Sequence, residues 1–416
     1  MKSAEVVIGA NFGDEGKGLV TDHLAAAYGK EALVLRFNGG AQAGHTVVTP
    51  DGRRHVFSHF GSGALAGAPS YLSRFFVVHP MLFLREARTL QELRGEPLVF
   101  AHPDALVTTP YDVMINHFAE AARGGERHGS CGVGFGATVE RNGDSRYALA
   151  LRDLFDGDEV VRRLHRIRQD YLPARLAALG VEALTEEQAA LAASDDVLER
   201  WLEDVADFLA SIEVASDSVL RSARQVIFEG AQGLLLDQRG RFFPHLTRSS
   251  TGLRNVLSLA GDLGIESLRV TYVTRAYLTR HGAGPLPGET GHPPCPAVVD
   301  ETNVTNDWQG ALRFAPLDLD LLGETIRADL GEAAGVFDIG LRHRLAVTCL
   351  DQVGPEVDFV LRGRRQRSAL EDVIGRAAAA AGSSRLLLAA GPTRDDVRAC
   401  SADALAPIAT RAAVLA

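Results

Sequence analysis

Short apolar runs alternate with amphipathic segments along most of the chain. Runs with the composition of buried strands lie at 6–8, 32–37, 75–78, 98–100, 226–228, 268–273, 345–348 and 385–389. Apolar residues recur at helical spacing in 19–27 and again from Ala369 onward. Strands that alternate with helices usually form a parallel sheet that is covered on both faces. The pattern therefore predicts an α/β fold with a large, mostly parallel central sheet flanked by helices, and a β-ribbon at 357–361.

One segment departs from this alternation. Between 157 and 225 the composition shifts to Ala, Leu, Glu and Arg, and apolar residues recur at helical spacing from 197 to 208. Thr185-Glu186-Glu187-Gln188 has the sequence of a capping box, which starts helices. We predict a helical subdomain at 157–225, inserted between strands of an otherwise single domain (1–416), with Trp201 in its core.

The composition is that of a globular protein, and its charge narrows the classes of partner. A net charge of −10 over 416 residues argues against nucleic acid as the main partner, because phosphate backbones bind to basic surfaces. A small anionic substrate needs only a few local arginines and is compatible with this charge. No signal-peptide pattern and no apolar run of membrane-spanning length is present, so we expect a cytoplasmic protein that does not bind membranes. Four widely spaced cysteines indicate neither a disulfide framework nor a zinc site: Cys131, Cys295, Cys349 and Cys400.

The first strand runs into a glycine-rich loop, Gly9-Ala10-Asn11-Phe12-Gly13-Asp14-Glu15-Gly16-Lys17-Gly18, and a helix follows. This layout is typical of loops that bind phosphate groups. A Walker A loop would need a glycine in place of Asn11 and a serine or threonine in place of Gly18. A carboxylate facing a triphosphate is unfavourable unless it binds a metal or takes a proton. The loop is therefore either a tight turn with solvated charges or a phosphate site that uses a carboxylate.

Three other glycine-rich segments carry candidate chemistry. The first, 38–46, brings His45 and Thr46 to the end of a strand, where α/β proteins place their sites, and its glycines let the backbone approach a ligand. The second, 128–136, has small side chains and a serine hydroxyl that suit a monophosphate, although flexible surface loops have the same composition. The third, 229–233, follows a predicted strand directly.

Later segments are open to more than one interpretation. The hydroxyl-rich stretch 243–251 suits either phosphate binding or the start of a helix. A long loop rich in glycine and proline follows the strand at 268–273 and ends at 303–313, and long loops without structure of their own are usually functional or disordered. Asp351, at a strand end, suits either the N–H groups of a guanine or a helix cap.

Four motifs, taken together and in this order, resemble the adenylosuccinate synthetase family. They are Gly13-Asp14-Glu15-Gly16-Lys17-Gly18, then Gly39-Gly40 with Ala43-Gly44-His45-Thr46, then Glu229-Gly230-Ala231-Gln232-Gly233, and then Ala276-Tyr277 with Thr279-Arg280. Weaker matches at 348–351 and 391–392 extend the resemblance over nearly the whole chain. The resemblance implies the P-loop-NTPase-like α/β fold of that family.

Resemblance to this family implies a ligase of purine biosynthesis that uses GTP and Mg²⁺. It implies that L-aspartate is joined to the 6-oxo carbon of inosine monophosphate (IMP), giving adenylosuccinate. The γ-phosphate of GTP first phosphorylates the oxo oxygen, which turns a poor electrophile into one with a good leaving group, and the aspartate amine then displaces phosphate. Whether ATP can replace GTP as the phosphoryl donor is left open by the sequence. The family also implies a homodimer.

The resemblance assigns the chemistry to four residues. Asp14 takes the purine N1 proton and binds Mg²⁺ together with Gly44, while Lys17 and His45 stabilise the moving phosphoryl group, with His45 as general acid. Gln232 holds the purine near its oxo group. The implied nucleotide-binding residues are Gly13, Glu15, Gly16, Lys17, Gly18, Gly44, Thr46, Asp351 and Gly391, among which Asp351 reads guanine.

The resemblance also implies the binding of the acceptor and of the amino acid. The implied acceptor- and phosphate-binding residues are Asn38, Gln42, Ser130, Cys131, Arg146, Gln232 and Thr247. Arg146 lies near the position of an arginine that the family lends across its dimer interface. Asn306 and Arg313 are the candidates for binding the amino acid, because Arg313 can grip a carboxylate bidentately.

The chain departs from the family pattern mainly on the acceptor side. Gln42 replaces an asparagine, Ser130-Cys131-Gly132 replaces Thr-Thr-Gly, Cys349 replaces a lysine, and 306–314 stands in place of the arginine-rich loop that binds aspartate. One alternative is therefore a diverged paralogue that joins aspartate or another amino acid to a different oxo acceptor, such as GMP, dGMP or a specialised metabolite. Another is a non-catalytic nucleotide-binding regulator, although a mere binder needs neither an acid nor a base.

Overall fold

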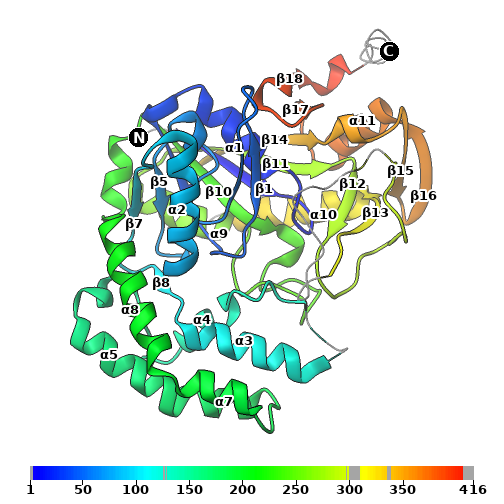
Figure 1. The fold of residues 1–416 in the computed structure, drawn as a ribbon. Helices are drawn as coiled ribbons and strands as arrows, with labels where there is room; N and C mark the ends of the chain where they lie inside the picture. Colours follow the sequence, from blue (N-terminus) through cyan, green and yellow to red (C-terminus); the bar gives the residue numbers. More distant parts are fainter. Residues whose placement is uncertain are drawn as a thin grey trace.

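A computed structural model of the chain describes residues 3–124, 127, 129–296, 298, 310–334 and 339–405. Its largest sheet contains ten strands (Figure 1). In their order across the sheet they are β18 (Val397–Ser401), β17 (Arg385–Ala389), β14 (Gly340–Thr348), β11 (Ser267–Arg275), β1 (Ser3–Gly9), β10 (Gln225–Gly233), β2 (Ala32–Arg36), β5 (Ser70–Leu72), β7 (Val99–Ala101) and β9 (Glu213–Val214). All neighbouring strands run parallel except β17 and β18. The predicted large, mostly parallel sheet is confirmed.

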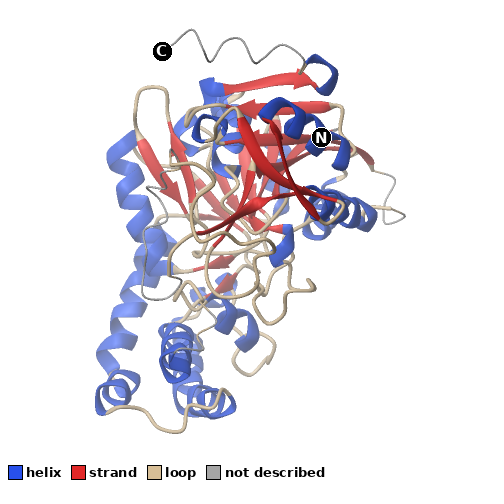
Figure 2. Cartoon of the chain, turned by 90° about the vertical axis from the view of Figure 1, so that its right-hand side faces the viewer, coloured by secondary structure: helices blue, strands red, loops and turns tan. Residues whose placement is uncertain are grey.

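Both faces of this sheet are buried. In β1, Val6 and Ile8 belong to one hydrophobic cluster, whereas Val7 belongs to another. Since successive strand residues point to opposite faces, the two clusters lie on opposite sides of the sheet. One contains side chains of α9 (Leu253–Leu263), α10 (Leu319–Glu332) and α11 (Leu370–Ala380), and the other contains side chains of α1 (Lys17–Ala26). Figure 2 shows helices on either side of the strands.

Most predicted strands form close to their expected positions, with two differences. The run at 75–78 forms only the short β6 (Val77–Val78), which pairs with β8 (Leu106–Val107) outside the large sheet. The place between β2 and β7 is taken by β5, whose three residues are too few to show a period in the sequence.

The segment predicted as a helical subdomain is helical up to Ala210. It contains α5 (Gly157–Arg166), a π-helical turn (Ile167–Tyr171), α6 (Leu172–Ala178), α7 (Glu186–Ala193) and α8 (Asp195–Ala210). Thr185 and Gln188 form the expected capping box, and the buried Trp201 is part of the core. Beyond Ala210 the chain returns to the large sheet as β9.

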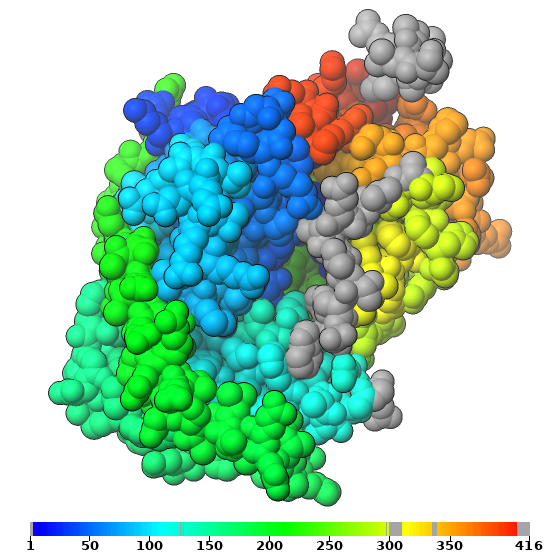
Figure 3. All heavy atoms as spheres, viewed as in Figure 1, coloured from blue at the N-terminus to red at the C-terminus, as the bar shows by residue number. Residues whose placement is uncertain are grey.

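These helices pack with three earlier ones, α2 (Pro80–Arg94), α3 (Pro110–Arg123) and α4 (Phe135–Arg141). One hydrophobic cluster joins Phe83 of α2, Phe118 of α3 and Phe208 of α8. Figures 1 and 3 show the resulting helical lobe below the sheet. Among the helices in the described ranges, none has both the length and the apolar character needed to cross a bilayer.

Two smaller sheets border the carboxyl edge of the large one. The first has the order β12 (Tyr277–Arg280), β13 (Arg313–Asp318), β15 (Glu356–Leu361) and β16 (Arg364–Ala369), so the β-ribbon predicted at 357–361 is confirmed. Its strand β12 lies within the segment expected to be a loop. The second is the hairpin of β3 (His45–Val48) and β4 (Arg54–Phe57), and His45 is the first residue of that hairpin.

Candidate functional site

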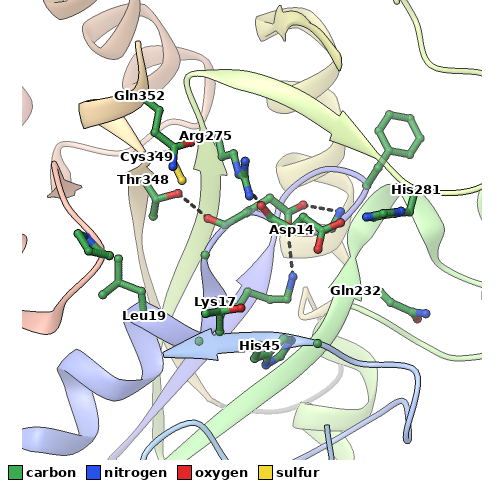
Figure 4. A pocket seen from close by; sticks show the side chains of 18 of the residues that line it. Asp14, Lys17, Leu19, His45, Gln232, Arg275, His281, Thr348, Cys349 and Gln352 are labelled. Carbon is green, nitrogen blue, oxygen red and sulfur yellow. Dashed lines mark hydrogen bonds and ion pairs between the residues drawn. The ribbon is translucent and has the colours of Figure 1, made fainter. Parts of the chain in front are cut away.

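A cavity of about 290 Å³ opens where β1, β10, β11 and β14 end (Figure 4). Parallel strands place their carboxyl ends at one edge of a sheet, and α/β proteins usually bind ligands there. The predicted site residues that line the cavity are Gly13, Asp14, Glu15, Gly16, Lys17, Gly18, Gln42, Gly44, His45, Thr46, Cys131, Gln232, Asp351 and Gly391. The fold therefore brings together most of the motifs that the sequence analysis singled out.

Unusual backbone conformations gather at the same place. Four described non-glycine residues have positive φ, and three of them line the cavity: Asp14 (61°), Gln232 (63°) and Cys349 (56°). Such conformations cost about 1–3 kcal/mol each and persist where the surrounding structure enforces them, which is common at binding sites. The cavity thus has the unusual backbone conformations that are common at binding sites.

The two carboxylates of the first loop have different environments. Glu15 is 2% exposed, and its carboxylate accepts hydrogen bonds from the backbone N–H groups of Asn11 (3.0 Å) and Gly13 (2.8 Å). It also accepts from Nζ of Lys17 at 2.8 Å. Glu15 therefore holds the loop and the Lys17 ammonium in place, and both of its carboxylate oxygens accept hydrogen bonds from the protein.

Asp14, in contrast, presents a carboxylate that accepts no hydrogen bond from the described residues. Only its backbone carbonyl is held, by Nε of Arg275 at 2.5 Å. The hydroxyl of Thr348 donates to the carbonyl of Glu15 at 2.6 Å, and a Cβ on Gly16 (φ +90°) would lie only 3.0 Å from the Thr348 side chain. The loop is thus anchored to the ends of β11 and β14, and the Asp14 carboxylate is left to act on a ligand.

His45 is oriented by a buried carboxylate. Its Nδ1 lies 2.8 Å from Oε1 of Glu229, and the two side chains are 6% and 0% exposed. Glu229 also accepts hydrogen bonds from the backbone N–H of Ser62 at 3.0 Å and from the Ser62 hydroxyl. Because Nδ1 is occupied, Nε2 is the ring nitrogen that remains for a ligand in the cavity.

Burial and charge act in opposite directions on this pair. Burial lowers the pKa of His45 below its ordinary value, and the charge and hydrogen bond of Glu229 oppose that shift without cancelling it. Burial by itself raises the pKa of Glu229, but His45, Arg36 and Ser62 outweigh it and lower this pKa to about 2. Glu229 is therefore ionised at neutral pH and favours the protonated imidazole that a general acid needs.

Just after β14 the polar side chains of Asp351 and Gln352 line the cavity. The hydroxyl of Tyr277 donates to Oε1 of Gln352 at 2.9 Å and accepts from Nη1 of Arg275 at 2.9 Å. These contacts orient the Gln352 amide so that its NH₂ group remains available to donate to a ligand. The neighbouring Asp351 is exposed, and the two residues together offer a hydrogen-bond donor and an acceptor.

A second group of polar atoms in the cavity has no hydrogen-bond partner among the described residues. Both amide atoms of Gln42 and Oε1 of Gln232 are buried, and in the described part of the chain none of them is hydrogen-bonded. Native proteins pair nearly all buried polar groups. These amides therefore indicate where a ligand supplies the missing hydrogen bonds.

Four predicted acceptor-binding residues do not line the cavity: Asn38, Ser130, Thr247 and Arg146. Asn38 is 0% exposed, and its amide bonds both the N–H and the carbonyl of Ala231, which joins the end of β2 to β10. The hydroxyl of Ser130 accepts a hydrogen bond from Asn116 at 2.7 Å. Thr247 is also buried. Their contacts with an acceptor stay predictions.

The remaining predicted residues lie outside the cavity lining or outside the described residues. Arg146 is 70% exposed and pairs with Asp144 at 2.6 Å. Arg313 donates from Nε and Nη2 to the carboxylate of Glu289, both at 2.8 Å. Asn306 lies outside the described residues.

The cavity is also lined by residues that the sequence analysis does not assign, namely Phe12, Leu19, Val48, Leu236, Arg275, His281, Thr348, Cys349, Gln352 and Pro392. Several of them directly flank a motif, as Arg275 and His281 flank 276–280, so adjacency to a motif is the signal that points to them. Glu229 lies within a motif, but its role follows only from its contact with His45.

A magnesium ion would have few protein ligands here. In the described ranges, no three His, Cys, Asp or Glu residues are grouped so as to hold a metal. Mg²⁺ is commonly held by one or two carboxylates together with substrate phosphates and water. The unpaired Asp14 carboxylate and the backbone of the exposed Gly44, both in the cavity lining, fit that kind of site.

Comparison with known proteins agrees with the motifs. A family model described as adenylosuccinate synthetase matches residues 6–312. The adenylosuccinate synthetase of Psychrobacter cryohalolentis is 32% identical over 291 residues, which are 68% of this chain and 64% of that protein. Adenylosuccinate synthetase 1 of Cupriavidus pinatubonensis is 33% identical over 307 residues, which are 72% of this chain and 66% of that protein. The chain thus spans about two thirds of the length of these relatives.

Two solved structures share the fold. The fully ligated adenylosuccinate synthetase of Plasmodium falciparum has a TM-score of 0.70 at 17% identity, covering 95% of this chain and 99% of that one. The succinoaminodeoxyadenylate synthetase of cyanophage S-2L, bound to dGMP and dATP, has a TM-score of 0.59 at 16% identity, covering 96% and 95%. At these identities the likeness concerns the fold alone, and it extends beyond residue 312.

Proposed function

Because this chain belongs to the adenylosuccinate synthetase family, we propose that it is a C–N bond-forming ligase that uses GTP and Mg²⁺ to join L-aspartate to IMP. The observation that carries the proposal is the Asp14 carboxylate, which lines the cavity without a hydrogen bond from the described residues. A phosphate-binding loop that only held a nucleotide would gain nothing from a negative charge at this position. A base is needed there if the acceptor must lose a proton.

In the proposed reaction Asp14 takes the N1 proton of IMP, and the oxo oxygen of IMP attacks the γ-phosphorus of GTP, which releases GDP. The aspartate amine then attacks C6, and the oxo oxygen leaves as part of inorganic phosphate. Lys17 and the protonated His45 stabilise the negative charge on the phosphoryl group during transfer. Mg²⁺, held by Asp14 and Gly44, would neutralise charge on the GTP phosphates.

The choice of GTP is supported by the polar pair at the end of β14. Guanine has an acceptor at O6 and donors at N1 and N2, whereas adenine has the opposite arrangement on that edge. The oriented NH₂ group of Gln352 and the carboxylate of Asp351 match guanine. GTP is therefore the proposed phosphoryl donor, and ATP is the comparison substrate.

We also propose a cytoplasmic homodimer in which Arg146 reaches the acceptor site of the partner. Arg146 is 70% exposed and lies outside the cavity of its own chain, where it pairs with Asp144 and lies over the ring of Tyr147. An exposed ion pair of this kind contributes little stability, so Arg146 can exchange it for a phosphate.

The proposed function is tested with the purified chain, Mg²⁺ and L-aspartate. We expect release of GDP and phosphate with IMP as acceptor, formation of adenylosuccinate by mass spectrometry, and a much lower kcat/KM with ATP. GMP and dGMP are measured in parallel. Turnover with GMP or dGMP but not with IMP would show that the acceptor is a guanine nucleotide and not IMP. Nucleotide binding without turnover of any acceptor would indicate a regulator.

Removal of the Glu229 carboxylate tests how His45 is oriented. We expect Glu229→Gln to lower kcat by about 10- to 100-fold, because His45 loses its fixed position. Without that carboxylate the pKa of His45 falls further. Activity that needs protonated His45 is lost as pH rises through its pKa, so the alkaline limb of the kcat profile should move to lower pH. An unchanged profile would show that Glu229 does not act through His45.

Arg313 is the described candidate for binding the amino-acid carboxylate. Nε and Nη2 of its guanidinium bind the carboxylate of Glu289, the same chemical group that the aspartate substrate would present. We expect Arg313→Lys to raise the KM for aspartate by about 10-fold or more, because an ammonium cannot form two parallel hydrogen bonds to a carboxylate. The KM for GTP serves as the control. If only the KM for the acceptor rises, Arg313 does not bind the amino acid and has a structural role.

A further inference from the structure

His281 is a half-buried side chain that the proposed mechanism does not use. It follows the last residue of β12 and lines the cavity, and both of its ring nitrogens are buried with no hydrogen-bond partner among the described residues. Figure 4 shows His281 and Gln232 toward the same side of the cavity, away from Thr348 and Gln352. A histidine with two unpaired buried nitrogens needs an explanation, because such groups are nearly always satisfied in native proteins.

The turn that carries His281 is held rigidly. Arg280, 1% exposed, donates to the carbonyls of Pro285 and His245, both at 2.8 Å. Arg313 donates from Nη1 to the carbonyls of Gly282 and Gly284, also at 2.8 Å. The imidazole is therefore placed by its neighbours on both sides, and its position is not a consequence of a loose loop.

The same turn packs against the loop that carries Cys131. Gly282 (φ +72°) and Gly129 (φ +71°) approach so closely that a Cβ on either would meet the backbone of the other at 3.0 Å or less. Cys131, two residues beyond Gly129, lines the cavity. This contact places His281 at the end of the cavity where the proposed acceptor binds.

The buried cavity-lining atoms that have no hydrogen-bond partner among the described residues belong to two amides and a histidine ring. They are the amide of Gln42, Oε1 of Gln232 and the His281 ring, and a neutral imidazole offers one donor and one acceptor. The Lys17 ammonium, in contrast, lies with the phosphate loop and is bound to Glu15. The unpaired groups therefore suit a neutral polar part of a ligand and not a phosphate.

We propose that His281 contacts an uncharged hydrogen-bonding group of the acceptor, a sugar hydroxyl or a base amino group, and thereby sets acceptor specificity. The inference rests on the proposed function in taking the acceptor to be a purine nucleotide. An acceptor that lacks this group leaves a buried nitrogen of His281 unpaired, and a site built for such a hydrogen bond discriminates strongly against it.

The test compares wild type with His281→Leu, His281→Asn and His281→Gln. Leucine removes both nitrogens at similar size, while the amide nitrogen of asparagine mimics Nδ1 and that of glutamine mimics Nε2. KM and kcat are measured with IMP, dIMP and GMP, and the KM for GTP is the control. Binding of the three acceptors is also measured directly by calorimetry, without GTP and aspartate, so that the result does not depend on turnover.

We expect His281→Leu to weaken binding of the preferred acceptor by about 10-fold or more and to reduce the discrimination among the three acceptors. The KM for GTP should be unchanged. One of the two amide variants should recover part of the loss. Loss of discrimination between IMP and dIMP identifies a sugar hydroxyl, and loss between IMP and GMP identifies the base amino group.

Unchanged acceptor binding in His281→Leu would overturn the inference, as would an equal loss for GTP, which indicates a structural role. Wild type that binds these nucleotides but does not ligate them would refute the proposed function alone, and weaker binding in His281→Leu would still support the inference. Wild type that binds none of the three would overturn both.

Discussion

Replacement of Asp14 by asparagine should lower kcat by about 10²- to 10⁴-fold while GTP still binds, because the amide cannot take the N1 proton of the acceptor. Asparagine tolerates the positive φ of 61° at this position and is nearly the same size as aspartate. The backbone contact with Arg275 and the buried Glu15 keep the loop in place. The measurement is steady-state kcat with saturating GTP, Mg²⁺, aspartate and IMP, together with the dissociation constant for GTP.

Asp351→Asn is the control for the Asp14 variant, because it removes a carboxylate at the other end of the same cavity. It should raise the KM for GTP and leave kcat at saturating GTP nearly unchanged. If Asp14→Asn keeps more than about a tenth of the wild-type kcat, Asp14 is not the base.

Replacement of His45 by asparagine should lower kcat by about 10²- to 10³-fold, because it removes the ring nitrogen that the proposed mechanism places toward the phosphoryl group. The asparagine amide nitrogen lies close to the position of Nδ1, so the hydrogen bond to Glu229 and the buried network with Ser62 are preserved. The loss can then be attributed to Nε2 alone.

His45→Gln is the matched variant, since its amide nitrogen lies near Nε2 and the hydrogen bond to Glu229 is lost. It should retain more activity than His45→Asn, because a neutral donor still reaches the phosphoryl group. Thermal unfolding and the dissociation constant for GTP are measured for both variants. Equal activity of His45→Asn and wild type would remove His45 from phosphoryl transfer.

The fold could be predicted in outline from local patterns. Strand runs that are apolar at every position, such as 226–228, indicate burial on both faces, and the helical periods between them indicate covering helices. The strand order could not be predicted, because β1 pairs with β10 and β11, more than 200 positions away in the chain. The strand β12 was missed because its pairing with β13 is also long-range.

The candidate site was predicted to a large extent, because its glycine motifs directly follow strands whose ends meet at one edge of the sheet. The two carboxylates next to each other in the first loop could not be told apart in the same way. The family resemblance assigned the base to Asp14, and the contacts show the physical difference: Glu15 is buried and bound to Lys17, whereas the Asp14 carboxylate faces the cavity. The same holds for Glu229, whose role depends on its distance from His45.

The class of fold and the family could be read from local periods and from motifs in a given order, and the same patterns predicted a phosphate-binding loop at 9–18. The tertiary structure decided which polar groups have partners and which do not. Arg313 is bound to Glu289, whereas His281 has two buried nitrogens without hydrogen-bond partners among the described residues. The physical reason is that hydrogen-bond satisfaction is a property of contacts between distant segments, and a local pattern of residues contains no record of them.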